Sequence, residues 1–148
     1  MAIDKISVEA AMAQRLLDST EIVDFVSTGI YPQKAPQSAT LPYIVINRDS
    51  AEHAHHLGGA SGWVMADIQV NMYSSEFTEM RRLAERARNE LDGYSGTVSI
   101  GSTSLQLRNV FLDSDSTPLD PVLPGRDEKI FRARHAYRVD YPESVPTL

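Results

Sequence analysis

The stretch WVMADIQVNMYSSEFTEMRRLAERARNELDG, residues 63–93, decides the fold class because its hydrophobic period changes once. Up to Tyr73, apolar and polar residues alternate, which predicts a strand with one buried face. Apolar residues then recur at helical spacing, which predicts a helix that Ser74 or Ser75 caps and that Asp92-Gly93 ends. The apolar stripe of this helix consists of Phe77, Met80, Leu83, Ala84, Ala87 and Leu91.

Shorter elements are predicted on both sides of this stretch. Ser7 is a candidate cap of an amphipathic helix, and Asp18-Ser19-Thr20 separates that helix from a second helical turn. Tyr43–Ile46 is almost continuously apolar, as in a strand buried on both faces. The predicted elements are helices near 8–17, 21–26 and 76–91, and strands near 43–46, 64–72, 97–100, 105–112 and 129–141.

Two long segments carry neither period. Asp49–Gly62 contains three histidines and many small residues, and Asp113–Arg126 is rich in Asp, Ser and Pro, so both are predicted to be loops. The order of elements predicts the α+β class: a mostly antiparallel sheet with helices packed on one face and long loops between strands. The 148 residues fit a single domain, with a core at about 7–141 and a short C-terminal tail at 142–148.

Composition excludes several functions before any motif is considered. The chain has no cysteine, so disulfides, thiolate nucleophiles and cysteine-ligated zinc are excluded. Its 14 Lys and Arg against 20 Asp and Glu give a net charge of −6, which argues against broad electrostatic binding to nucleic acid. No apolar run approaches the roughly 20 residues of a membrane helix, and Met1–Lys5 lacks the pattern of a signal peptide.

A histidine-rich group, formed by Glu52, His53, His55 and His56, is the candidate metal site. Neutral imidazoles are common ligands of zinc and nickel. The spacing is less favourable, because in an extended segment His53 and His55 share one side while His56 faces away. We therefore expect a polar segment used for contacts, and a metal-binding module or metal-dependent enzyme remains the alternative.

Other catalytic patterns are missing from the sequence. No Gly-x-Ser-x-Gly elbow presents a serine, and the glycines lack the spacing of a phosphate-binding loop. Asp113, Asp115, Asp120 and Asp127 do not follow the register of a calcium loop. We therefore expect no enzyme, no cofactor and no bound metal.

Three arginines form the one basic concentration with a structural basis. Arg132, Arg134 and Arg138 are predicted on one face of the last strand, spread over about 20 Å. Their guanidinium groups suit carboxylates or phosphates, and the negative net charge favours protein carboxylates or solvent over DNA. The opposite face carries Phe131, Ala133, His135, Tyr137, Val139 and Tyr141.

A series of short features also follows in a fixed order from Ser7 to about Tyr141. After the N-terminal helix come Gly29-Ile-Tyr-Pro32, Ala35-Pro-Gln37, Leu41-Pro-Tyr-Ile-Val45, the histidine-rich stretch to Gly62, Asp67-Ile-Gln-Val-Asn-Met-Tyr73, Leu91-Asp-Gly93, Phe111-Leu-Asp113 and the closing aromatic strand. Each feature alone is common, but their order and spacing together are specific. In this series the chain resembles the tail-completion proteins, also called tail-terminator or head–tail joining proteins, of long-tailed phages and gene-transfer agents.

The resemblance implies a non-enzymatic structural protein of the virion that is assembled in the host cytoplasm. Such proteins form a hexameric ring at the head-proximal end of the tail, where they stop polymerisation of the tail tube protein. The ring also docks to the head–tail connector or stopper protein. DNA passes through its channel without specific binding, and no membrane is involved. The fold that the resemblance implies, a sheet with helices on one side, agrees with the pattern of elements above.

A ring built from one kind of subunit needs two different patches on each subunit, and loops and exposed strand edges supply them. A third reading is a small adaptor or toxin–antitoxin-like module that binds one partner through the same loops. The candidate residues for contacts with subunits or partners are His53, His55, His56, Leu57, Gly58, Gly59, Trp63, Arg132, Arg134 and Arg138.

Overall fold

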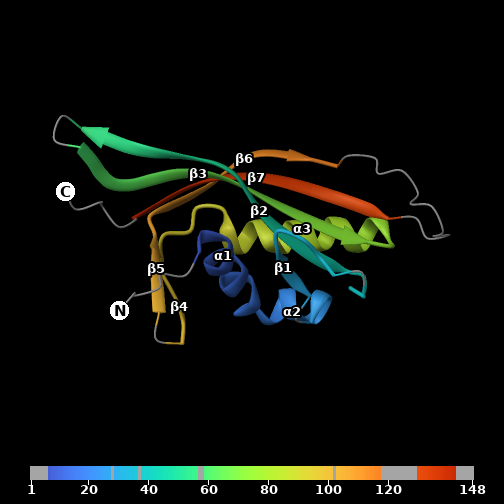
Figure 1. The fold of residues 1–148 in the computed structure, drawn as a ribbon. Coiled ribbons are helices and arrows are strands. Elements are labelled where there is room, and N and C mark those ends of the chain that lie inside the picture. Colours follow the sequence, from blue (N-terminus) through green and yellow to red (C-terminus); the bar gives the residue numbers. More distant parts are fainter. Residues whose placement is uncertain are drawn as a thin grey trace.

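A twisted sheet covered by helices on one face forms the body of the protein (Figure 1). The computed structural model describes residues 7–27, 29–36, 38–56, 59–101, 103–117 and 130–142, and for 52–56 and 59–63 it describes the backbone alone. Within these ranges the helices are α1 (Val8–Leu17), α2 (Thr20–Val26) and α3 (Phe77–Leu91). The strands are β1 (Ile30–Pro32), β2 (Tyr43–His56), β3 (Gly59–Ser74), β4 (Gly96–Ile100), β5 (Thr103–Leu107), β6 (Asn109–Ser116) and β7 (Phe131–Pro142).

Strand β3 lies at the centre of the main sheet, whose described strands are ordered β1-β2-β3-β7-β6. It pairs antiparallel with β2 on one edge and with β7 on the other. Only the short β1 is parallel to its neighbour, β2. Strands β4 and β5 form a separate hairpin. The fold is therefore α+β with a mostly antiparallel sheet, as the sequence predicts.

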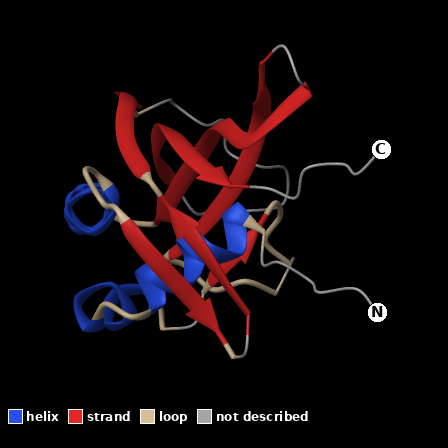
Figure 2. Cartoon of the chain, turned by 90° about the vertical axis from the view of Figure 1, so that its left-hand side faces the viewer, coloured by secondary structure: helices blue, strands red, loops and turns tan. Residues whose placement is uncertain are grey.

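The core lies between the sheet and the helices, which share one of its sides (Figures 1 and 2). Alternate residues of β3 point into it, and the apolar stripe of α3 packs over them. Both predicted patterns are confirmed, except that Phe77 is 52% exposed and packs edge-on against Phe131. The buried apolar side chains of these two elements are Val64, Ala66, Ile68, Val70, Met72, Met80, Leu83, Ala84, Ala87 and Leu91.

The N-terminal helices follow the predicted pattern. The hydroxyl of Ser7 accepts a hydrogen bond from the backbone N–H of Ala10, which confirms the predicted cap. After α2 the chain turns sharply into β1 through Gly29, where a Cβ atom would lie 2.9 Å from the carbonyl oxygen of Val26. Glycine is therefore required for this turn, which sets β1 beside Ile44–Ile46.

The prediction of a loop over Asp49–Gly62 is wrong. The backbone on both sides of residues 57–58 is paired strand, and β2 and β3 form one long hairpin. The alternation that marks a strand is hidden because the register shifts twice, between Arg48 and Ser50 and again between His53 and His55. The first shift leaves Asp49 without a cross-strand partner, and the second leaves Ala54 on β2 and residues 61–63 on β3 without one across the hairpin, so the apolar positions move out of phase.

The prediction of one strand over 105–112 is also wrong, because the chain changes sheets at Arg108. Leu105 and Leu107 are buried from β5, whereas Val110 is buried from β6 in the main sheet. Strand β6 extends to Ser116, so the predicted 113–126 loop is strand at its start, and residues 118–126 lie outside the described residues.

The start of α3 also differs from the prediction. Glu76 is the N-cap residue and makes no side-chain cap. The hydroxyl of Ser74 instead accepts from the N–H of Glu76 and donates to the carboxylate of Glu79. At the other end Gly93 has φ of +82°, as the predicted stop requires.

Replacing Leu83 with alanine should lower the free energy of unfolding by about 2–5 kcal/mol, because its side chain is fully buried between α3 and the sheet. Urea denaturation measures the difference. Glu85→Ala, on the exposed side of the same helix, is the matched control and should change stability by less than about 0.5 kcal/mol. Equal effects of the two variants would contradict the described packing.

Candidate interaction surfaces

The far end of the β2–β3 hairpin projects from the body. Trp63, paired with Pro142, is the last residue of β3 that the described part of β7 reaches, and beyond it the described residues of β2 and β3 pair only with each other. We call residues 53–56 and 59–62 the arm; in Figure 1 it extends to the upper left. His55 is paired with Ala60 and His56 with Gly59. Among the described residues, both strands of the arm therefore have an outer backbone edge without a strand partner.

The structure leaves the role of the histidine cluster untested. The backbone brings His53, His55, His56, Gly59 and Trp63 into the paired hairpin, but their side chains lie outside what is described. Leu57 and Gly58 lie outside the described residues altogether. Among the side chains that are described, no group of three or more His, Asp or Glu residues is arranged to hold a metal ion.

The three arginines of β7 do share one face, the outer face, which is the side of the sheet opposite the core. Arg138 is exposed, and its guanidinium lies 3.9 Å from the carboxylate of Asp67 on β3. Arg132 and Arg134 are half-buried, and the guanidinium of Arg132 lies 6.0 Å from the ring centre of Tyr73. The predicted arginine face is confirmed, and part of its charge is offset by a neighbouring strand.

Aromatic side chains gather next to Arg132 on the outer face. Tyr43 stacks on Tyr73 with ring centres 4.9 Å apart, and Tyr31 meets Tyr43 edge-on at 6.1 Å. These tyrosines come from three adjacent strands, so they link β1, β2 and β3 where β1 ends the sheet. The sequence gives no signal for this contact, because it depends on which strands are neighbours.

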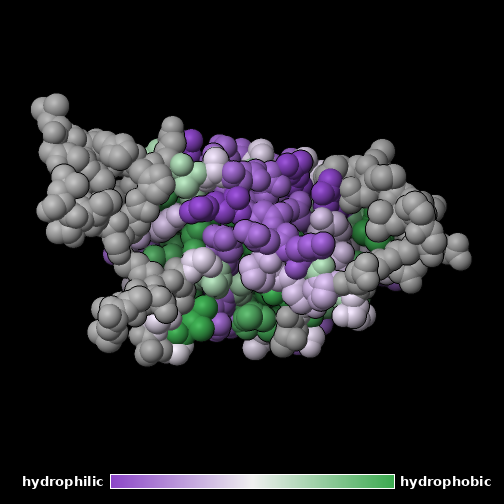
Figure 3. Space-filling view, in the orientation of Figure 1, coloured by the Kyte–Doolittle hydropathy of each residue, from purple (hydrophilic) through white to green (hydrophobic). Residues whose placement is uncertain are grey.

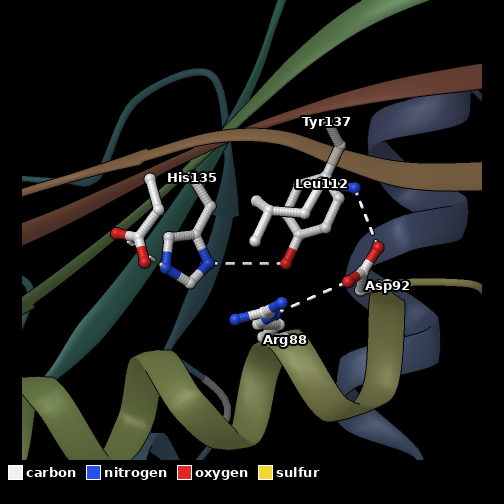
Figure 4. A network of polar contacts seen from close by, with 6 residues as sticks. Arg88, Asp92, Leu112, His135 and Tyr137 are labelled. Atoms are coloured by element: carbon white, nitrogen blue, oxygen red, sulfur yellow. Dashed lines mark hydrogen bonds and ion pairs between the residues drawn. The ribbon is translucent and has the colours of Figure 1, made fainter.

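A polar network joins the end of α3 to β6 and β7 (Figure 4). The carboxylate of Asp92 accepts from the N–H of Leu112 at 2.9 Å and lies 3.5 Å from the guanidinium of Arg88. His135 on β7 is almost fully buried, 3.5 Å from the carboxylate of Asp115 and 3.4 Å from the hydroxyl of Tyr137. The network fixes the helix end to the sheet.

Burial sets the charge state of this network. It lowers the pKa of His135, and the nearby Arg88 and Arg81 lower it further, while Asp115 acts in the opposite direction. Burial also raises the pKa of Tyr137. Both groups are therefore neutral at pH 7, and the histidine stabilises the core without carrying a charge.

Two hollows lie along α3. The larger, between α2 and α3, has a volume of about 630 Å³ and contains an ion pair of 2.8 Å between Glu21 and Arg86. We call it the α2–α3 groove; its lining residues are Glu21, Asp24, Phe25, Arg82, Glu85, Arg86 and Asn89. A smaller hollow of about 310 Å³ lies between α3 and the strands that carry Asp115 and His135.

The visible surface has mixed polarity. In Figure 3, hydrophilic side chains gather in the upper middle of the view, over the sheet, and hydrophobic ones lie along the lower side. Among the described residues, none of the helices has the length and apolar character needed to cross a membrane.

Burial lowers the pKa of His135 below 6.5 in the folded chain. As the pH falls, the unfolded chain therefore takes up a proton at this residue at a higher pH than the folded chain does. The stability that depends on the neutral histidine is complete above about pH 6.5 and is lost as the pH falls through the folded pKa. Between about pH 7.5 and pH 5.5, wild type should lose more unfolding free energy than His135→Gln, by up to about 1.4 kcal/mol per pH unit. Urea denaturation at both pH values checks this, and equal losses would refute it.

Comparison with known proteins identifies the family. The family model described as tail completion protein gp17 matches residues 10–120. A chain in the solved structure of the virion of a native gene transfer agent particle has the same fold, with a TM-score of 0.71, 14% sequence identity and coverage of 92% of this chain and 95% of that chain. A search of curated protein sequences finds no significant match. The chain therefore belongs to the tail completion protein gp17 family, and it is a structural protein of a phage-type tail.

Proposed function

We propose that this protein forms a ring at the head-proximal end of a phage or phage-like tail tube, ends tube polymerisation and joins the tail to the head connector. The observation that carries the proposal is the family match over residues 10–120. The fold shared with a chain of a gene transfer agent virion supports it. In this role the protein is not an enzyme, and it acts through contacts between its surface and other proteins.

The described strand edges favour one side of the sheet for contacts between subunits. Strand β6 ends the sheet, but its first half is already capped: the N–H of Gly93 donates to Val110, and the N–H of Val110 donates to Tyr94. The carboxylate of Asp92 accepts from Leu112 next to them. Strand β2 is different, because β1 covers only Ile44–Ile46. Its longer remaining part has no described strand on that edge, so it is the edge open to a partner.

The partners follow from this location. The ring is a homo-oligomer, hexameric by resemblance to the family, that contacts the tail tube protein on one side and the connector or stopper protein on the other. The arm and the arginine face, with Arg138 most exposed, are the proposed contact surfaces. A net charge of −6 suits a channel that DNA crosses without specific binding.

Ring formation is directly testable. Purified protein, alone and with tail tubes, should form rings of identical subunits, because a head-to-tail contact between two different patches closes when the rotation is right. Native mass spectrometry and electron microscopy measure subunit number and shape. A chain that stays monomeric at high concentration and also with tail tubes would overturn the proposal.

Removing the arm should separate folding from assembly. Replacing residues 54–63 with Asn-Gly joins His53 to Val64, which already face each other in the hairpin, through a turn that this dipeptide favours. The core residue Val64 is kept, so the melting temperature should stay within a few degrees of wild type. Ring or tail assembly should be lost, as measured by sedimentation and by counts of complete tails.

The control for this variant is Ser99→Ala, at an exposed position on β4 outside the proposed contact surfaces, which should leave both stability and assembly nearly unchanged. Normal tails from the shortened hairpin would show that the arm is not an assembly surface.

A further inference from the structure

We propose that the smaller hollow, between α3 and the strands that carry Asp115 and His135, binds one oxyanion group, a carboxylate or a phosphate, through the arginines of α3. We call this hollow the α3–β7 hollow. The inference adds a ligand site to the proposed function, and the site does not depend on the formation of a ring.

The periodicity of α3 brings three cations to this hollow. Positions 81, 85 and 88 follow the spacing of three and four residues that defines one face of a helix, and position 82 lies beside them. Arg81, Arg82 and Arg88 all line the hollow, against the carboxylates of Glu85 and Asp115. Since the buried imidazole is neutral, the lining has an excess of one positive charge.

Most of the guanidinium donors in this lining are unused. Among the described residues, Arg81 and Arg82 make no hydrogen bond and no ion pair. Arg88 has one ion pair of 3.5 Å, which is longer than the distance of about 2.9 Å in a strong charge-assisted hydrogen bond. Each guanidinium presents five N–H donors in a planar fork that matches the oxygens of a carboxylate or phosphate. The α3–β7 hollow therefore offers donors for an oxyanion.

A buried imidazole with long contacts on both nitrogens lies at the inner side of the hollow. His135 is 2% exposed, with its Nε2 atom 3.5 Å from the carboxylate of Asp115 and its Nδ1 atom 3.4 Å from the hydroxyl of Tyr137. Both distances exceed the range of about 2.7–3.2 Å that hydrogen bonds in proteins prefer. Figure 4 shows the side chain of Arg88 pointing toward His135 and Tyr137. A further acceptor in this space would offset part of the cost of burying the ring.

The electrostatics of His135 depend on the same cations. Arg88 and Arg81 both lower the pKa of His135, so their positive potential reaches the ring. An anion bound between these arginines acts in the opposite direction and raises the pKa of His135. Binding of the anion and protonation of the histidine are therefore linked. The charged and titratable groups around this ring are Arg81, Glu85, Arg88 and Asp92 on α3 and at its end, Asp115 on β6 and Tyr137 on β7.

Titration of the full chain with inorganic phosphate tests the site. At constant ionic strength against chloride, phosphate should shift the imidazole NMR signal that is missing from His135→Gln, and it should raise the pKa of that imidazole. Arg81→Gln should weaken phosphate binding by at least about fivefold, because one charge-assisted hydrogen bond is lost. Arg86→Gln is the matched control: it makes the same change on the same helix, but in an arginine that is paired with Glu21, and it should bind phosphate like wild type. Equal affinity in wild type and both variants, or no effect of phosphate on His135, would overturn the inference.

Attachment to tail tubes distinguishes the two sources of the oxyanion. If the ligand is a carboxylate of a neighbouring tail protein, phosphate should compete with attachment, and Arg81→Gln should cosediment with tubes less than Arg86→Gln does. If free phosphate is the ligand, both variants should attach like wild type, and only Arg81→Gln should lose phosphate binding. Failure of wild type to attach under any condition would contradict the proposed function, whereas the phosphate titration would still decide on the site.

Discussion

The fold depends on one constraint: β3 must be hydrogen-bonded along both edges while one of its faces is buried. Its neighbours β2 and β7 satisfy the backbone groups, and the helices cover the buried face. A slip of one residue would move Ile68 and Val70 to the outer face and bring Asp67 and Gln69 into the core. The register of the sheet is therefore set here. The position of α3 follows from it, because this helix begins three residues after β3 ends.

The parts of the fold that the sequence predicts are those in which the buried side alternates without interruption. This holds for β3, for β7 and for the stripe of α3. It fails over 49–62, where two register shifts break the alternation of β2. It also fails at Arg108, where β5 passes into β6; the buried positions Leu107 and Val110 are three residues apart, a spacing that a single strand does not produce.

For the candidate surfaces, the sequence predicts which face of a strand a residue occupies, but it does not predict the neighbours of that residue on other elements. Alternation alone places the β7 arginines on one face, because the side-chain period of a strand is local. It does not say that Asp67 lies beside Arg138, since that depends on which strand pairs with β7. The α2–α3 groove was not predicted for the same reason: its acidic and basic residues come from helices about 50 residues apart in the chain.

The two sides of the main sheet are unequal, and this inequality favours a ring over a two-fold dimer. At one side, β6 is capped over half its length by the turn after α3 and carries Asp113 and Asp115 beyond the cap. At the other side, β2 continues past β1 into an arm without carboxylates. Pairing β6 with β6 would bring acidic edges together, which is unfavourable. A contact between two different patches avoids this repulsion, and repetition of such a contact around an axis produces a closed ring when the rotation fits.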